Sequence, residues 1–199
     1  MERLIQLQRL LDKTKAFDFL GPLALRIYLA PIFFLAGVHK LGHVQDVAEW
    51  FAWLGMPAPT LMVYLAGLTE LLGGIALLLG IALRWFAIPM MVTMIVAAAT
   101  THWDNGWHAL PETQLTVPWE WEKDKIAEAN KRKEEAKALL KEYGDYERLT
   151  EYGSITILKN GIEFAATYFI MLLVLFFTGA GKLSVDHLLY ERFFRNAIP

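Results

Sequence analysis

Four long apolar runs alternate with polar segments along this chain of 199 residues. Three of the runs contain one charged side chain each, namely Arg26, Glu70 and Glu163, and one run contains none. A helix needs about 20 apolar residues to cross the hydrocarbon core of a bilayer, whereas helices of soluble bundles show a polar stripe every turn. The pattern therefore predicts four transmembrane helices, at about residues 20–39, 60–82, 84–102 and 161–180.

The two ends of the chain show an amphipathic pattern instead. Leu4, Leu7 and Leu11 fall on one helical face, and most basic residues lie away from it. This arrangement is typical of a helix that lies in the membrane interface, although a frayed tail is the alternative. Near the other end, Ser184 is placed to cap a short interfacial helix that runs to Phe193.

A polar segment rich in helix formers separates the third and fourth apolar runs. Acidic residues come first, lysines follow, and Gly144 stands just past the end, as expected for a soluble helix at about residues 119–143. Two interpretations stay open. The helix either packs lightly on the outer face of the membrane as a solvated element, or it forms a docking surface for a protein partner.

Together these elements predict an all-α integral membrane four-helix bundle with amphipathic interfacial helices at both termini and a soluble helical insert between helices three and four. Lys and Arg lie mainly beside the termini and the turn after the second helix, so we expect both termini in the cytoplasm. The expected parts are residues 1–102 with the N-terminal interfacial helix and three membrane helices, the extracytoplasmic insert 103–160, and residues 161–199 with the last membrane helix and the C-terminal interfacial helix.

Composition excludes several classes of chemistry. The chain has no cysteine, so thiolate metal ligation, disulfide exchange by the protein itself and Cys-ligated iron–sulfur clusters are impossible. The formal net charge is −2, which gives no basis for a nucleic-acid partner. The environment that the apolar runs do imply is the lipid bilayer.

Glu70 lies in the middle of the second apolar run, where a charge is costly unless it faces protein or water. Gly67 and Gly74 share its helical face and allow another helix to come close. Counting along the helix places Glu70 about 15 Å below the outer surface. Arg26 lies in the inner half, and the sequence leaves open whether it simply neutralises Glu70. We predict a polar, outward-opening pocket that binds a ligand through Glu70, Arg26, Lys40, His39, His102 and Glu163.

Four histidines near the outer surface are candidate metal ligands. His39 and His43 are four residues apart, a spacing that lets two side chains on one helix bind the same ion. His102 and His108, with a nearby carboxylate, could complete the coordination of copper or zinc. The alternative is that all four are solvated side chains at the interface.

Two segments resemble a known family. "LRIYLAPIFFLAGVHKL" is similar to the first helix of the DoxX family, and "LAGLTELLGGIALLLGIALRW" is similar to the second. The resemblance covers about residues 20–105 and, more loosely, "TGAGKLSVDHLL". It implies a small four-helix protein of the bacterial inner membrane. The residues that match the family's recurring positions are Arg26, Gly37, Lys40, Glu70, Gly74 and Arg84, whereas the insert departs from the shorter members.

The resemblance also implies a range of activities. Some family members are associated with thiosulfate oxidation that feeds electrons to quinone, some with oxidative-stress complexes, and one branch with the maturation of copper-binding peptides. A family this varied determines fold better than chemistry.

Three functions follow for this chain. The first is an accessory subunit of a membrane redox system that binds quinone or a similar ligand in the Glu70 pocket, because a buried acid suits proton-coupled chemistry. The second is a structural or assembly subunit that docks partners through the insert. The third is a copper- or zinc-handling membrane protein. Whether the chain turns over a substrate at all is not decided by the sequence.

Overall fold

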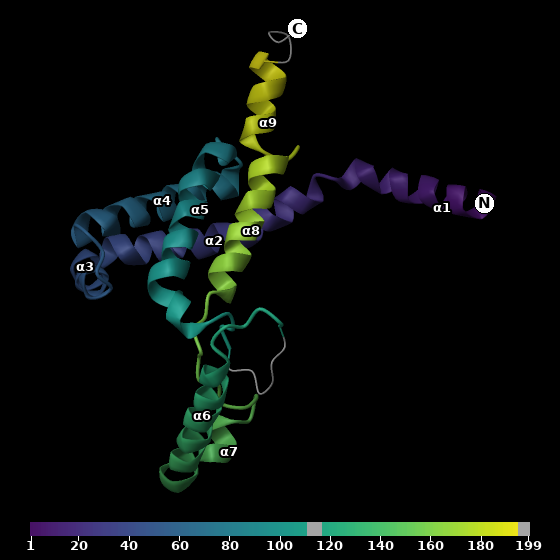
Figure 1. The fold of residues 1–199 in the computed structure, drawn as a ribbon. Helices are drawn as coiled ribbons and strands as arrows, with labels where there is room; N and C mark the ends of the chain where they lie inside the picture. The colour runs from purple at the N-terminus through teal and green to yellow at the C-terminus, as the bar shows by residue number, and fades with distance from the viewer. Residues whose placement is uncertain (111–116, 195–199) are drawn as a thin grey trace. The chain divides into compact units, whose positions relative to one another are not determined.

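The computed structural model describes residues 1–110 and 117–194, and all regular structure in these residues is helical (Figure 1). Short 3-10 or π turns extend several helices, among them the π turn Ala98–His102 after α5. The α-helices are α1 (Glu2–Lys13), α2 (Leu20–Gly42), α3 (Val44–Trp53), α4 (Pro59–Leu79), α5 (Leu83–Ala97), α6 (Lys123–Tyr143), α7 (Tyr146–Leu149), α8 (Glu163–Thr178) and α9 (Val185–Leu189).

Three helical segments in the described part of the chain are long and apolar enough to cross a bilayer. They are Leu20–Gly42, Pro59–Leu79 and Leu83–Asn105, in the places that the apolar runs predict. The apolar helix α8 has 16 residues, a length of about 24 Å against the roughly 30 Å of a hydrocarbon core. The fourth span, the bundle and the insert outside the membrane therefore stay predictions.

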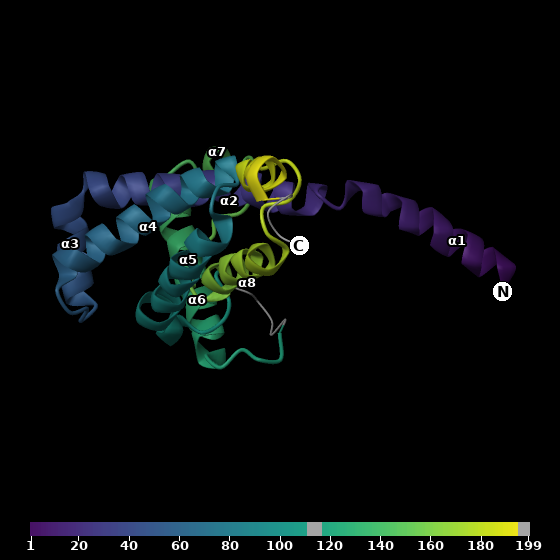
Figure 2. The same cartoon turned by 90° about the horizontal axis from the view of Figure 1, so that it is seen from above.

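The helices belong to two compact units, residues 1–93 with 168–199 and residues 94–167. These borders cross α5 and α8, so the division differs from the parts expected at residues 102 and 160, and those expected domain borders stay a prediction. In the first unit α2 and α4 lie side by side, as Figures 1 and 2 both show.

Glycines hold α2 and α4 at backbone contact. A Cβ atom at Gly37 would overlap backbone atoms of Leu71 and Gly67, and one at Gly74 would overlap the backbone of Phe34. Small residues allow such close approach, and dispersion contacts between the two backbones then stabilise the pair. The apolar face that α2 and α4 build around these glycines includes Leu29, Phe33 and Leu77, all of which are fully buried.

Replacing Gly37 with Ala is expected to loosen this helix pair. The added Cβ meets backbone, which cannot rotate away, so we expect a loss of about 2 kcal/mol of stability. The measurement is thermal unfolding of the detergent-purified protein. Gly42→Ala is the matched control, since no atom lies within 4 Å of a Cβ at that position. Equal melting temperatures for the two variants would contradict the close contact.

Helix α3 is an element that the sequence analysis did not predict. His43 has φ −130° and ψ 47°, which breaks the helical path after Gly42 and starts a second helix. Val47 and Phe51 of α3 are buried against Val63 of α4. Only ten residues long, α3 gives no membrane-length apolar run, so a search for spans passes over it.

The helix predicted at residues 119–143 is present, but it begins four residues later, at Lys123. The carboxylate of Glu120 accepts hydrogen bonds from backbone N–H groups on both sides of it and so holds the preceding residues in a loop. The helix ends where expected, with the Gly144 N–H donating to the Leu140 carbonyl at 2.9 Å. The predicted cap at Ser184 is confirmed: its hydroxyl accepts the N–H of His187 at 3.1 Å.

Candidate ligand site at Glu70

Glu70 is paired with a lysine from the neighbouring helix. The Nζ atom of Lys40 on α2 donates a hydrogen bond to Oε2 of Glu70 on α4, and the two atoms are 2.6 Å apart. The Glu70 side chain is 6% exposed and that of Lys40 is 21% exposed. A charge-assisted hydrogen bond of this length offsets part of the cost of removing both groups from water.

The register of the helix pair determines how far Glu70 lies from the end of α2. Gly67 is placed against Leu41 and Lys40, and Leu71 against Gly37, so Glu70 lies level with the last residues of α2. Since α2 ends at Gly42, this level is within about 8 Å of the end of α2. Glu70 is closer to the end of α2 than to the start of α4, because the first turns of α4 pack against α3, whereas its depth in the membrane stays a prediction.

Arg26 binds backbone carbonyls rather than Glu70. Its Nε donates to the Leu77 carbonyl at 2.7 Å and Nη2 donates to that of Leu78 at 3.0 Å, at the last turn of α4. Nη1 donates to the carbonyls of Ala180 and Leu183, each at 2.8 Å. Arg26 as a whole is 2% exposed. The interpretation in which Arg26 neutralises Glu70 is therefore wrong, because Lys40 has that role.

A second charged residue, Asp186, binds the backbone at the same end of the first unit. The Asp186 carboxylate accepts the N–H groups of Ala82 at 2.7 Å and Leu83 at 3.2 Å, where α5 begins. Its own N–H donates to the Gly80 carbonyl at 2.9 Å. Arg26 and Asp186 together attach the segment after α8 to the turn between α4 and α5. Both contacts satisfy helix ends that have no internal partner.

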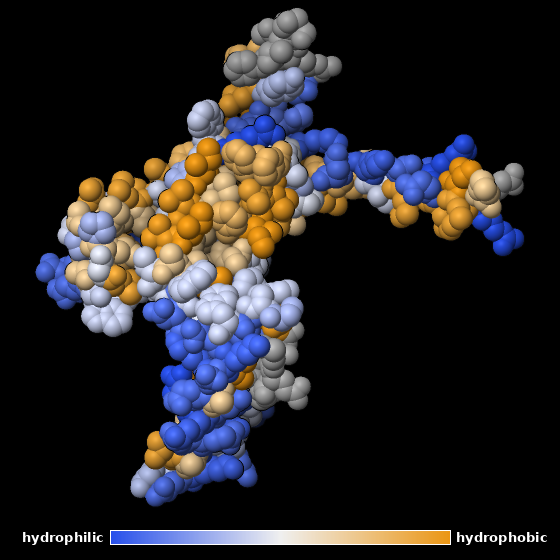
Figure 3. All heavy atoms as spheres, in the orientation of Figure 1, coloured by the Kyte–Doolittle hydropathy of each residue, from blue (hydrophilic) through white to orange (hydrophobic). Residues whose placement is uncertain are grey.

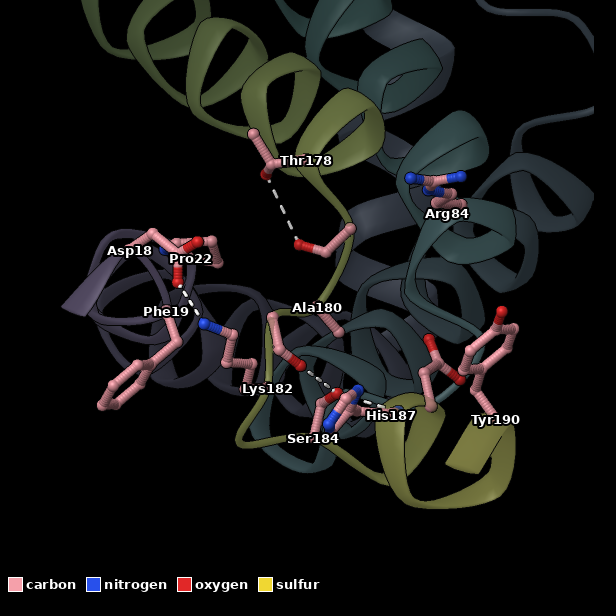
Figure 4. A pocket seen from close by; sticks show the side chains of 13 residues that line it. Asp18, Phe19, Pro22, Arg84, Thr178, Ala180, Lys182, Ser184, His187 and Tyr190 are labelled. Carbon is pink, nitrogen blue, oxygen red and sulfur yellow. Dashed lines mark hydrogen bonds and ion pairs between the residues drawn. The ribbon is translucent and has the colours of Figure 1, made fainter. Parts of the chain in front are cut away.

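A cleft of about 820 Å³ lies beside this attachment (Figure 4). Arg84 and Tyr190 line it to the right of the segment 178–184 in that view, and Asp18 and Lys182 line it to the left. The Nζ atom of Lys182 lies 2.9 Å from Oδ1 of Asp18, and this hydrogen bond holds the pKa of Asp18 below its usual value.

The unit of residues 94–167 has its own buried ionic pair, Glu120 with Lys159, joined by a 2.5 Å hydrogen bond. Burial by itself raises the pKa of the Glu120 carboxyl, but hydrogen bonds from Lys159 and from the N–H groups of Glu122, Trp107 and His108 lower it to about 2. The carboxylate is thus charged at neutral pH and organises the loop around it.

The two predicted ligand residues of this second unit, His102 and Glu163, each have a partner within it. Nδ1 of His102 lies 2.9 Å from the Asn160 carbonyl. The Glu163 carboxylate accepts the N–H of Ala109 at 3.0 Å. Of the six predicted ligand residues, the first unit holds Lys40 and Glu70 in contact and Arg26 at its end. The place of His39, His102 and Glu163 in one pocket with them stays a prediction.

The four candidate metal ligands are divided between the units. The rings of His39 and His43 stack with their centroids 4.7 Å apart. Nε2 of His108 lies 3.9 Å from the Glu120 carboxylate. Within residues 1–110 and 117–194, no three His, Asp or Glu side chains gather closely enough to hold a metal ion. A copper or zinc site built from His39, His43, His102 and His108 stays a prediction without support from these contacts.

Three residues with buried or organising roles were missed from the sequence: Glu120, Lys159 and Asp186. Glu120 and Lys159 stand in polar segments, where an ionisable side chain is usually solvated. Glu120 and Lys159 are each other's partners, and they lie 39 residues apart in the sequence. No local sequence pattern relates two positions so far apart. Asp186 follows a predicted cap, but the helix start that it binds belongs to a different part of the chain.

The sequence of this chain is similar to known proteins in the region that contains Lys40 and Glu70. Residues 21–103 match the family model described as DoxX. This segment is therefore similar to a DoxX domain. The matched segment includes nearly all of α2 and the whole of α3, α4 and α5, and it contains both Lys40 and Glu70. Most of the unit of residues 94–167 lies outside the match.

The chain is also similar to a curated relative in Bacillus subtilis (strain 168), named "Putative oxidoreductase CatD". The two sequences are 31% identical over 87 residues, which cover 44% of this chain and 63% of the relative. This chain thus spans less than two thirds of that relative's length. No solved structure matches the chain.

Proposed function

We propose that this protein is an accessory subunit of a membrane redox system and binds quinone, or a similar ligand, beside Lys40 and Glu70. The observation that carries the proposal is the buried pair of these side chains at 2.6 Å. Acidic and basic residues are rare inside membrane-spanning segments, and where they occur they commonly mark substrate or ion pathways or proton relays. The match to the DoxX family, and a relative named "Putative oxidoreductase CatD", support the same class of function.

The chemistry of the pair suits a quinone. The ammonium group of Lys40 can donate a hydrogen bond to a quinone carbonyl oxygen, and the Glu70 carboxyl can give up or accept the proton that accompanies each electron. Reduction of a quinone to a quinol takes up two electrons and two protons. We assign the supply of electrons to a partner protein and the positioning of the quinone oxygen to this chain.

The membrane placement that goes with this function has α8 as the fourth span and both termini in the cytoplasm of a bacterium. The insert then lies outside the inner membrane. Basic residues beside the termini, and Arg84 at the start of α5, support this orientation. In this placement Lys40 and Glu70 lie in the outer half of the membrane.

Organic extraction of the protein purified in mild detergent tests the proposal. We expect quinone to accompany the wild-type chain and to be lost from Glu70→Gln, because an amide neither carries nor releases a proton. Glu49→Gln, an exposed acid on α3, is the matched control and should retain quinone. Wild-type protein without quinone, even after incubation with an excess of it in detergent, would refute the assignment.

A structural or assembly subunit is the second candidate. The observation that favours it is the separate unit of residues 94–167, which has its own buried ionic pair and a 21-residue helix, α6. Such a module suits docking of a partner protein. Metal analysis of the same preparation covers the third function, since stoichiometric copper or zinc would favour a metal-handling protein.

A further inference from the structure

Helix α1 exposes an unusual amount of apolar surface. Five apolar side chains in twelve residues have exposed fractions between 49% and 70%. Every described side chain from Arg3 to Lys13 is exposed. In Figure 3 the arm formed by α1 shows apolar and hydrophilic side chains next to each other along its length. The apolar residues are Leu4, Ile5, Leu7, Leu10 and Leu11.

The apolar residues of α1 gather mainly on one face. At about 100° per residue, Leu4, Leu7 and Leu11 fall within a 60° arc. Arg9 and Lys13 lie on the other side of the helix. An apolar face opposed by basic residues is the pattern of helices that lie in the membrane interface.

Helix α1 contains three basic residues and two acids, Glu2 and Asp12, and so keeps a net positive charge. The carboxylate of Asp12 is already paired with Lys15, with 2.8 Å between Nζ and Oδ1. Among the described side chains of this helix, no acid is paired with Arg3, Arg9 or Lys13, and these three can act on surroundings outside the helix. Basic residues close to a bilayer are attracted to anionic headgroups over about one Debye length.

The chain itself holds α1 close to a bilayer. Lys13 is followed by the 3-10 turn Thr14–Phe17, and the candidate span α2 begins at Leu20. Six residues separate the end of α1 from a membrane helix, so the helix cannot leave the neighbourhood of the headgroups. Tethering raises its effective concentration at the surface and makes weak individual contacts sufficient for docking.

From these observations we propose that α1 docks on an anionic lipid surface. Leu4, Leu7 and Leu11 enter the boundary between headgroups and acyl chains, and Arg3, Arg9 and Lys13 contact lipid phosphates. The ligand is the phosphate of anionic phospholipids in the leaflet where α2 begins. This inference does not depend on quinone binding, and it adds a lipid preference to what the apolar pattern alone implies.

Charge favours a bilayer over a protein partner as the occupant of this face. When an amphipathic helix binds in a groove of another protein, a few apolar side chains of the helix fill the groove. Such binding does not require basic residues along the length of the helix. An anionic bilayer attracts all three basic residues at once. Each basic residue near such a surface raises the docking constant about fivefold, so three raise it about a hundredfold at low salt.

A fluorescent probe at Leu7 tests the proposal in the whole protein. The chain has no cysteine, so Leu7→Cys takes a single environment-sensitive dye without further changes. The protein is placed in nanodiscs of phosphatidylcholine alone or of phosphatidylcholine with phosphatidylglycerol. We expect blue-shifted emission and quenching by bromolipids in the anionic nanodiscs, both weakened by salt. Gln6→Cys, about 100° away around the helix, is the matched control and should respond less.

A charge variant separates lipid attraction from apolar insertion. Arg3→Gln, Arg9→Gln and Lys13→Gln together, with the dye at position 7, should lose the response to phosphatidylglycerol. Free glycerol phosphate should not reproduce the response, since the proposal requires a phosphate in a bilayer. Equal embedding in neutral and anionic nanodiscs would refute the lipid preference. A dye that stays in water in both would refute docking and leave the apolar face to a protein partner.

Discussion

The Glu70→Gln variant is expected to be less stable than the wild type by about 3 kcal/mol, because it leaves the Lys40 ammonium without its carboxylate inside the helix pair. Gln preserves the shape and can still accept a hydrogen bond, so the helices should form as before. The measurement is thermal or denaturant unfolding in the same detergent as the quinone extraction. Lys40 is 21% exposed and can partly reach water, which limits the loss.

A double-mutant cycle with Lys40→Met shows whether the two side chains act on each other. Each single variant leaves one unpaired charge, whereas the double variant leaves none, so we expect it to recover most of the lost stability. Quinone should be absent from both single variants and from the double variant. Recovery of stability together with retained quinone would mean that the pair only neutralises two charges, and the redox proposal would fail.

The Arg26→Met variant is expected to lose about 4 kcal/mol, because four carbonyl oxygens then lack a donor where each unsatisfied group costs about 1–3 kcal/mol. The carbonyls belong to the last turn of α4 and to the segment after α8. Loss of the hydrogen bonds from Arg26 should therefore separate these two parts first. Faster proteolysis of the chain after Gly179, with melting at a lower temperature, is the result to look for.

Two other variants test this role of Arg26. Arg84→Met removes an exposed guanidinium that makes one hydrogen bond to the Phe177 carbonyl, and it should cost little. Arg26→Lys keeps the charge but not the planar set of donors, so it should recover only part of the stability. An Arg26→Met protein that unfolds like the wild type but loses quinone would instead make Arg26 a ligand residue, as the sequence analysis predicted.

The two sets of variants distinguish structural from chemical roles for intramembrane charges. Arg26 satisfies backbone groups that cannot reach water in a membrane, which is a requirement of the fold. Glu70 and Lys40 pair with each other, and a buried ion pair of this kind can often be replaced by apolar residues without loss of stability. A pair that the fold does not need is the better candidate for a ligand site.

Sequence by itself determined the membrane class, the positions of three candidate spans and the resemblance to the DoxX family. These depend on the hydropathy of long segments and on local motifs, which involve residues close together along the chain. Helix α6 and the cap at Ser184 were predictable for the same reason, since helix formers and caps act within a few residues.

Only the tertiary structure decided which charges meet. Helical periodicity placed Arg26, Lys40 and Glu70 on faces that point inward, but it contains no information on how far α4 slides along α2. The contact of Gly37 with the backbone at Leu71 determines that register, and it brings Lys40, not Arg26, to Glu70. Arg26 is then left at the end of α4, where free carbonyls are available. Arg26 and Lys40 are both on α2, about 21 Å apart along its axis, so the register alone decides which of them reaches Glu70, and a change of register alters no local pattern of residues.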